Sequence, residues 1–363
     1  MTPDRQILDI PTQVTRLGVI VEPNGDANEA EGVLNPAIAR ARDGKLVMYP
    51  RVVGAGNVSR VGLFVAEGNG AVPEFRRRGY ALQPAAPYEL RYKAGGYGCE
   101  DPRVTFVPCL DQFVMCYTAF GPAGPRIALA LSSDGYTWDR AGMLDFLAAG
   151  RPNGDDKDAA FFPEPVLSPA GVESLALYHR PMLTLSAVHG YQASDEMLAM
   201  PPESRESIRI AYIPLADVLA DRRNLLIVRE SALVAFPQGD WGLVKLGGGT
   251  PPVRIEEGWL SLYHGVDLLP SPDGRRRLRY SAGLLVHDAQ RPHIVRYRSP
   301  QPIFVPETRQ ELTGIVNNVV FPTGLDPQPA LGERRYDVYY GMADYRIGCV
   351  RMELGESVVE AAA

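Results

Sequence analysis

The sequence predicts an all-β protein, and three observations agree on this. The chain contains 36 glycines and 32 prolines, which suit short strands and tight turns better than long helices. Strand-like runs, in which apolar and polar residues alternate, follow one another closely along the chain. Few windows have the spacing of an amphipathic helix. Because 45% of the residues are hydrophobic, the chain can bury a sizeable core.

The strand pattern repeats five times. Each copy has a polar or proline-marked start, a strand, a turn, and a second strand that ends in an aromatic residue followed by polar ones. The copies cover residues 35–51, 101–119, 158–180, 249–265 and 318–341. The closing tyrosines, Tyr49, Tyr117, Tyr178, Tyr263 and Tyr340, lie 61 to 85 residues apart. This spacing leaves room for about four short strands per copy. Since no copy can bury both of its faces alone, the sequence predicts a ring, which is a five-bladed β-propeller.

We expect one domain across residues 1–363. Residues 1–30 precede the first copy and are expected to form an N-terminal extension with a candidate strand at 16–22, and residues 355–363 a loose tail. The stretch near residues 185–208 is helix-compatible and lengthens the gap between the third and fourth copies, so we expect a surface insertion there. The sequence leaves open whether this insertion is a lid over the site, an oligomer arm or neither, and whether the protein is a homo-oligomer.

Composition excludes several classes of function. The formal net charge of −6 argues against a nucleic-acid partner, because a phosphate backbone requires a positive field. No apolar run approaches the ~18 residues of a membrane helix, and the first residues lead into no secretory signal. The four cysteines form no CxxC pair, as expected of reduced thiols in a cytoplasmic protein. His287, Asp288 and His293 lack the spacing of metal ligands, so we expect no metal.

The strand starts carry the candidate functional residues. In a propeller the first strand of each blade lines the central channel, so residues at corresponding positions face one another. The starts hold Asn35, Glu100–Asp101, Lys157–Asp158, Thr250 and Asn317–Asn318, and the second strands end near Arg51, Thr118, His179–Arg180, His264 and Asp344. A salt bridge between blades explains any single charge. The convergence of so many charges favours a functional site, because buried charge is costly unless it is paired or used.

Such a ring of side chains suits sugar chemistry. A carboxylic acid can protonate a leaving glycosidic oxygen, while amides, carboxylates and arginines hold hydroxyl groups. Asp101 is the candidate acid. Lys157, Arg180, Lys245 and His264 form a candidate anion site within an acidic protein, which is what a phosphate nucleophile requires.

At these residues the chain resembles glycoside hydrolase family 130, the β-mannoside phosphorylases and their hydrolytic relatives. The resemblance spans nearly the whole chain, from Asn35 to about Asp344. The motifs that carry it are Glu100–Arg103, Phe161–Glu164, His179–Pro181, Lys245–Arg254, Gly258–Gly265 and Gly341–Asp344. It implies a five-bladed propeller, in agreement with the repeat count.

The resemblance also implies a role for each site residue. Asp101 is then the general acid and passes its proton through the mannose 3-hydroxyl to the glycosidic oxygen. Phosphate attacks the anomeric carbon from the opposite face and gives α-mannose 1-phosphate. The implied phosphate contacts are Lys157, Arg180, Lys245 and His264, and the implied sugar contacts are Asn35, Arg51, Arg103, Asp158, Tyr263 and Asp344. An oligosaccharide and inorganic phosphate are the expected partners, without a cofactor. Asp158 departs from the asparagine of some phosphorylases and adds a negative charge beside the proposed anion.

Two other functions stay open. An inverting hydrolase needs a second carboxylate as base, about 6.5–9.5 Å from the acid, and Asp158, Glu307 and Asp344 are candidates. A non-catalytic propeller that only binds glycans is the other alternative. The hydrolytic relatives lack the basic cluster, and phosphate needs no separate base. We therefore expect phosphorolysis of β-1,2- or β-1,4-linked manno-oligosaccharides.

Overall fold

The computed structural model describes residues 7–68, 72–91, 95–183, 191–270 and 277–359. These residues form a nearly all-β structure, which confirms the predicted class. The α-helices in these ranges are α1 (Tyr191–Ala199), α2 (Leu215–Ala220) and α3 (Arg309–Leu312). In the same ranges no helix is long and apolar enough to cross a membrane.

The strands fall into five four-stranded antiparallel units, of which the first two are joined. The first unit contains β3 (Gly32–Arg40), β4 (Leu46–Gly54), β5 (Val58–Glu67) and β6 (Glu74–Leu82). The second contains β7 (Tyr97–Val107), β8 (Gln112–Gly121), β9 (Gly124–Ser132) and β10 (Asp139–Met143). A short parallel pairing of β5 with β7 merges them into one eight-stranded sheet.

The third and fourth units each carry one additional short strand. The third contains β11 (Asp156–Phe161), β13 (Glu173–Pro181), β14 (Ile208–Pro214) and β15 (Glu230–Ala235), with β12 (Val166–Leu167) beside β13. The fourth contains β16 (Lys245–Gly248), β18 (Gly258–Leu269), β19 (Arg277–His287) and β20 (Val295–Arg298), with β17 (Val253–Ile255) beside β18. The fourth unit therefore starts at Lys245 and not at Gly249, where the sequence repeat placed it.

Both ends of the chain contribute to the fifth unit. It contains β21 (Val320–Pro327), β22 (Arg335–Met342), β23 (Arg346–Leu354) and the N-terminal strand β2 (Thr12–Val21). Beside it, β1 (Ile7–Asp9) pairs with β24 (Val358–Val359). The segment expected to be an N-terminal extension thus provides the outer strand of the last sheet, and part of the expected tail is paired.

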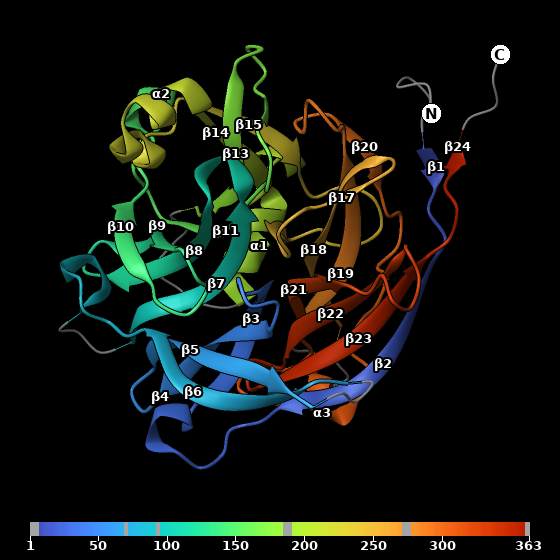
Figure 1. The fold of residues 1–363 in the computed structure, drawn as a ribbon. Helices are drawn as coiled ribbons and strands as arrows, with labels where there is room; N and C mark the ends of the chain where they lie inside the picture. Colours follow the sequence, from blue (N-terminus) through green and yellow to red (C-terminus); the bar gives the residue numbers. More distant parts are fainter. Residues whose placement is uncertain (1–6, 69–71, 92–94, 184–190, 271–276, 360–363) are drawn as a thin grey trace.

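The hydrophobic core lies between the units, which surround a common centre (Figure 1). Five buried clusters each join two units that are neighbours in the chain, and one of them joins the fifth unit to the first. Representative pairs are Tyr49 with Met115, Val114 with Leu177, Tyr178 with Tyr263, Leu262 with Val338, and Cys349 with Met48. Every unit therefore buries both faces against its neighbours, as the repeat argument requires.

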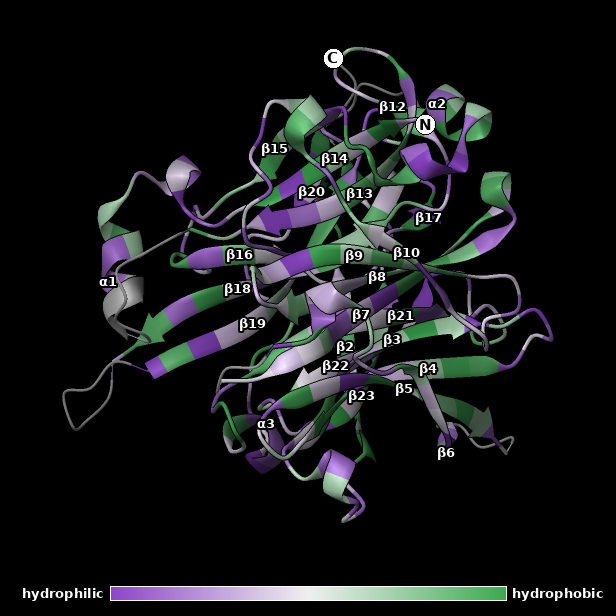
Figure 2. Cartoon of the chain, turned by 90° about the vertical axis from the view of Figure 1, so that its left-hand side faces the viewer, coloured by the Kyte–Doolittle hydropathy of each residue, from purple (hydrophilic) through white to green (hydrophobic). Residues whose placement is uncertain are grey.

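The predicted insertion contains a helix. α1 lies beside β18 and β19 at one side of the molecule (Figure 2). Its buried Met197 packs with Val244 and Val266, and Leu198 packs at the edge of the same cluster. Residues 184–190 of the predicted stretch lie outside the described residues. Within the described part, Arg205 also donates to the carbonyl oxygen of Leu243 and Glu206 pairs with Arg180, so the insertion contacts the sheets at several points.

Candidate active site

The first strands of the units surround a cavity of about 200 Å³. It is lined by residues from all five units, namely Asn35, Arg51, Asp101, Lys157, Asp158, Arg180, Met182, Lys245, His264, Tyr280, Val319, Phe321 and Asp344. Nine of the eleven site residues proposed from the sequence are in this wall. Arg103 and Tyr263 are not.

Three of the polar strand starts lie in β-bulges. Asn35, Asp101 and Asp158 have φ angles of 44°, 46° and 60°, and the strand register shifts at each of them. A bulge bends the strand and re-aims the side chain, and here it turns each polar group into the cavity. Asparagine and aspartate tolerate the left-handed region better than other residues with a Cβ, which explains their recurrence at these positions.

Asp101 is held as an ionised carboxylate at one end of the cavity. Its Oδ1 accepts hydrogen bonds from Asn35 Nδ2 at 2.9 Å and from an Arg51 Nη at 3.3 Å, and the residue is only 8% exposed. Burial alone would raise the pKa of this carboxyl, but Arg51, Lys157 and Arg103 together bring it below its ordinary value. In the free protein Asp101 therefore accepts hydrogen bonds and carries no proton at neutral pH.

Glu100 connects two cations beside Asp101. One carboxylate oxygen accepts from Arg51 at 2.9 Å and the other from Lys157 Nζ at 3.0 Å. Lys157, expected among the phosphate ligands, is thus paired at the acid end of the cavity. Glu100 is 3% exposed, and two charge-assisted hydrogen bonds offset the cost of burying it. We infer that Glu100 fixes the positions of both cations.

The other side of the cavity carries the basic cluster. Arg180 Nε donates to Asp158 Oδ2 at 2.6 Å, and another nitrogen of Arg180 pairs with Glu206. Lys245 Nζ lies 3.9 Å from the same Glu206 oxygen. Glu206 lies outside the repeats, within the stretch near residues 185–208 expected to be an insertion, and its spacing predicts no contact with Arg180. The anion site is therefore partly neutralised by two buried carboxylates.

His264 is a neutral member of this cluster. Burial, reinforced by the neighbouring cations, lowers the pKa of His264 to about 3 despite the opposing charge of Asp158, whose Oδ2 lies 3.8 Å from Nε2. Its Nδ1 is buried without a hydrogen-bond partner among the described residues. His264 can thus offer a neutral N–H to an anion, where the sequence suggested a cation.

Arg103 lies beneath the cavity and connects the second unit to the fourth. Its side chain is fully buried and donates to the carbonyl oxygens of Gly249 at 2.9 Å, Gly248 at 3.0 Å and Asp101 at 3.0 Å. All three hydrogen bonds are to backbone oxygens. The nearest carboxylate oxygen, that of Asp158, lies 3.6 Å from the guanidinium. Arg103 therefore supports the site from below, and the sugar-binding role expected for it has no basis in this geometry.

Tyr263 also lies away from the cavity. Neighbouring residues of a strand point to opposite faces, so Tyr263 points away from the cavity that His264 lines. The Tyr263 ring stacks on Trp241 with centroids 5.3 Å apart, and its hydroxyl accepts from Arg298 Nε at 3.0 Å. Tyr263 is a core residue, in contrast to the sugar-binding role expected from the sequence.

Sequence reasoning missed the apolar part of the wall. Phe321 packs against His264 with ring centroids 4.3 Å apart, and Tyr280 stacks on His264 at 6.0 Å. Val319 and Met182 complete this side. Flat apolar surfaces next to hydrogen-bonding groups match the two kinds of surface of a sugar ring. The only sequence signal was the strand pattern in which Tyr280 and Phe321 occur.

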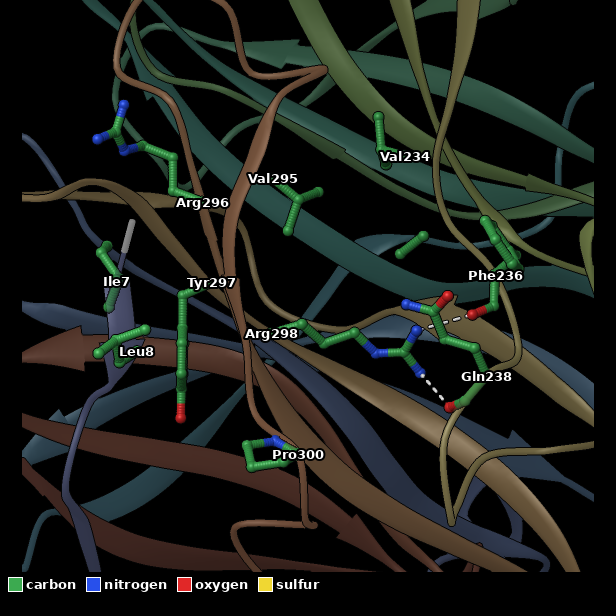
Figure 3. Close-up of a pocket in the computed structure, with 11 residues that line it drawn as sticks. Ile7, Leu8, Val234, Phe236, Gln238, Val295, Arg296, Tyr297, Arg298 and Pro300 are labelled. Carbon is green, nitrogen blue, oxygen red and sulfur yellow. Dashed lines mark hydrogen bonds between the residues drawn. The ribbon is translucent and has the colours of Figure 1, made fainter. Parts of the chain in front are cut away.

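A larger pocket, of about 410 Å³, lies between β1, β15 and β20 (Figure 3). Arg298 in this pocket donates to the carbonyl oxygens of Phe236 at 2.7 Å and Gln238 at 3.5 Å. The Tyr297 hydroxyl donates to Asp9 at 3.0 Å. These polar groups connect neighbouring segments of the chain. Among the residues that line this pocket, carboxylates and cations do not converge as they do in the central cavity. We therefore take the central cavity as the candidate active site.

A second polar cluster lies behind the cavity. His179 Nδ1 lies 2.7 Å from Asp156 Oδ2, and its Nε2 lies 2.8 Å from Ser231 Oγ. The order resembles a serine-hydrolase triad, but the His179 side chain is fully buried. Asp156 and His179 alternate with Lys157 and Arg180, so they point away from the cavity. We interpret the cluster as a support for the strand ends that carry Lys157 and Arg180.

Charges of both signs balance around the cavity. The cations are Arg51, Arg103, Lys157, Arg180 and Lys245, and the carboxylates are Glu100, Asp101, Asp158, Glu206 and Asp344. In the described parts of the chain, no group of three His, Cys, Asp or Glu residues is placed to hold a metal ion. The arrangement can therefore move a proton at one end and hold an anion at the other.

Comparisons with known proteins identify the family of the chain. Residues 5–360 match the sequence model of glycoside hydrolase family 130, which is described as beta-1,4-mannooligosaccharide phosphorylase. A beta-1,2-mannobiose phosphorylase of Thermoanaerobacter sp. is 30% identical over 260 residues, covering 71% of this chain and 67% of the relative. A beta-1,4-mannooligosaccharide phosphorylase of Ruminococcus albus is 36% identical over 123 residues, 34% of each chain.

Solved structures show the same fold. The beta-1,2-mannobiose phosphorylase of Listeria innocua, in complex with beta-1,2-mannobiose, superposes with a TM-score of 0.66 at 20% identity, covering 94% of this chain and 97% of that one. The phosphate complex of a mannose phosphorylase from Leishmania mexicana has a TM-score of 0.59 at 14% identity, covering 97% and 94%. Together with the match over residues 5–360, these likenesses confirm the resemblance seen in the sequence, and the chain belongs to glycoside hydrolase family 130.

Proposed function

We propose that this protein is an inverting glycoside phosphorylase that acts on β-mannosides. Its substrates are β-1,2- or β-1,4-linked manno-oligosaccharides and inorganic phosphate, and its sugar product is α-mannose 1-phosphate. The five units act as the blades of one five-bladed propeller, and the cavity at their centre holds both substrates. The naming of its relatives as mannoside phosphorylases supports the substrate class.

One observation supports phosphorolysis most strongly. Asp101 and the cluster of Arg180, Lys245 and His264 line the same cavity. An acid close to a leaving oxygen and a group of N–H donors close to an anion are the two requirements for attack by phosphate on a glycoside. A hydrolase or a glycan-binding module has no use for the second group.

The proposed reaction assigns a role to each side of the cavity. Asn35, Arg51 and Asp344 hold the mannose next to Asp101. Asp101 donates a proton, through the mannose 3-hydroxyl, to the glycosidic oxygen as the bond to C1 breaks. Phosphate, held by Arg180, Lys245 and His264, attacks C1 from the opposite face. Displacement from that face inverts the anomeric centre.

The test is a pair of incubations with β-1,2- and β-1,4-linked mannobiose, one with inorganic phosphate and one without it. We expect mannose 1-phosphate and free mannose in equal amounts with phosphate, and almost no turnover without it. Release of mannose at equal rates in both, without a sugar phosphate, would contradict phosphorolysis.

Hydrolysis is the second candidate, and two contacts favour it. Asp158 and Glu206 both pair with Arg180, so carboxylates stand where an incoming phosphate would meet the cation. Either carboxylate is also a candidate base for water. Measuring turnover and oligosaccharide binding of Asp101→Asn distinguishes either enzyme, phosphorylase or hydrolase, from a module that only binds glycans. Loss of turnover with retained oligosaccharide binding is the result that an enzyme predicts.

A further inference from the structure

We propose that Asp101 and Asp344 share one proton, which Asp344 holds while the site is free and Asp101 delivers to the substrate. This inference rests on the proposed function, because it assigns the source of the proton that the leaving sugar needs. It adds a task in phosphorolysis to Asp344, for which the sequence suggested sugar binding or, in a hydrolase, the role of base.

Asp101 cannot store the proton in the free protein. Its Oδ1 already accepts hydrogen bonds from Asn35 and Arg51, and a protonated carboxyl would lose most of the attraction of Arg51. Lys157 adds a second positive charge close by, since it is paired with the adjacent Glu100. A general acid held in this state needs a proton from a neighbouring group before it can act.

Asp344 is the neighbouring carboxyl group, and within the described ranges it lacks the hydrogen-bond donors and the paired cation that hold Asp101 ionised. It lines the same cavity, and in the described part of the chain its carboxylate makes no hydrogen bond and no ion pair. The charged groups that face it are Asp101 and Glu100 of β7, Arg51 of β4 and Lys157 of β11. Burial raises the pKa of Asp344 to about 6, and the charge of Asp101 adds to the rise.

The two carboxylates thus differ in what they can hold. Two carboxylates in one cavity do not both ionise freely, and the one without a cationic partner keeps the proton. A mannose hydroxyl placed between the groups would compete for the Asn35 and Arg51 donors of Asp101. The same hydroxyl would connect Asp101 to Asp344 for transfer of the proton.

The proton balance closes over one catalytic cycle. The bond between mannosyl C1 and the glycosidic oxygen breaks, its electron pair stays on the oxygen, and that oxygen receives the shared proton. A phosphate oxygen forms the new bond to C1, and the proton of the hydrogen phosphate returns to the carboxylate pair. No other acid, base or oxidant is required.

The test compares the pH dependence of kcat/KM for Asp344→Asn and the wild type on mannobiose at saturating phosphate. Asparagine suits the backbone of this position, where φ is 51°. Without Asp344, the proton leaves Asp101 at lower pH, so we expect the ratio of variant to wild type to fall by up to about tenfold between about pH 5 and pH 7. Taking this ratio cancels the titration of phosphate itself.

Two controls distinguish the proton-holding role of Asp344 from a role in sugar binding alone. Asp158→Asn removes another cavity carboxylate, and its ratio to the wild type should stay constant over the same pH range. With p-nitrophenyl β-mannoside, whose leaving group needs little protonation, the Asp344→Asn ratio should also be constant. A ratio on mannobiose that does not change with pH overturns the shared proton.

Difference infrared spectroscopy gives a second readout in the absence of substrate. We expect the band of a protonated carboxyl to titrate near pH 6 in the wild type and to be lost in Asp344→Asn. Its persistence in that variant would place the proton elsewhere. Two different results would overturn the two proposals. Turnover by the wild type without phosphate would contradict the proposed function, whereas a ratio of kcat/KM between Asp344→Asn and the wild type that is constant with pH would contradict only the shared proton.

Discussion

Arg180 Nε lies 2.6 Å from Asp158 Oδ2, so the guanidinium that faces the cavity is already paired with a carboxylate before an anion binds. The pair is buried, with 6% and 2% of the two side chains exposed. It holds Arg180 in a fixed position, and it also cancels part of the charge that would attract phosphate. The departure of Asp158 from asparagine therefore has a physical consequence.

Asp158→Asn should strengthen phosphate binding. Asparagine keeps a hydrogen-bond acceptor for Arg180 and tolerates the φ of 60°, but it removes a negative charge from the anion site. We expect the KM for phosphate to fall about three- to tenfold, which corresponds to about 1 kcal/mol. Initial rates over a range of phosphate concentrations measure it. A KM that rises would mean that the ion pair serves phosphate binding by positioning Arg180.

Lys245→Ala should weaken phosphate binding. Lys245 lines the cavity and is the cation of the cluster with the longest contact to a carboxylate, 3.9 Å to Glu206. We expect the KM for phosphate to rise about tenfold or more, while the KM for mannobiose changes little. Arg254→Ala removes an exposed cation of the same unit and serves as the matched control. An unchanged phosphate dependence would remove Lys245 from the site.

The sequence predicted the site best where a repeat and a local backbone requirement coincide. Asn35, Asp101 and Asp158 stand at the same place in three copies because each bulge needs a short polar residue with positive φ. Strand pairing then brings Arg51 and Arg180 to the same cavity from the second strands. These residues could be found without coordinates because the repeat fixes their relative positions.

The other features of the site could not be predicted from the spacing of residues along the sequence. Tyr263 and His264 are adjacent, and only the strand's orientation decides which of them lines the cavity. Glu206 lies outside the repeats and reaches Arg180 through the fold alone. In the fourth unit β16 begins at Lys245 and includes Gly247, which pairs with His264. A Cβ on Gly247 would collide with the His264 ring, so the close approach of the two strands requires glycine there.

Arg103 should be essential for stability more than for substrate binding. Its buried guanidinium holds the carbonyl oxygens of Gly248 and Gly249, so its loss leaves these acceptors without a partner. We expect Arg103→Met to lower the free energy of unfolding by about 3–5 kcal/mol in urea titrations. Arg76→Met, at an exposed ion pair with Glu67, should change it by less than about 0.5 kcal/mol. Equal effects of the two variants would contradict the supporting role.

Asp344 should make stability depend on pH in a definite direction. Its pKa is raised in the folded protein, to about 6 from the ordinary 3.8, so the folded state loses stability relative to the unfolded state as the pH rises through this window. Asp344→Asn should therefore be more stable than the wild type above pH 6, by on the order of 3 kcal/mol. The difference should shrink as the pH approaches 4. Urea titrations at several pH values measure it, and a difference that is constant with pH would contradict the raised pKa.

The central claim is that one cavity transfers a mannosyl group to phosphate with Asp101 as the acid. Phosphorus NMR of mannobiose and inorganic phosphate, incubated with the wild type or with Asp101→Asn, tests it most directly. We predict that the wild type produces the signal of α-mannose 1-phosphate and that Asp101→Asn, while still binding the disaccharide, reduces its rate at least about a hundredfold. A wild type that releases mannose without any sugar phosphate, or an Asp101→Asn variant with unchanged turnover, would contradict the claim.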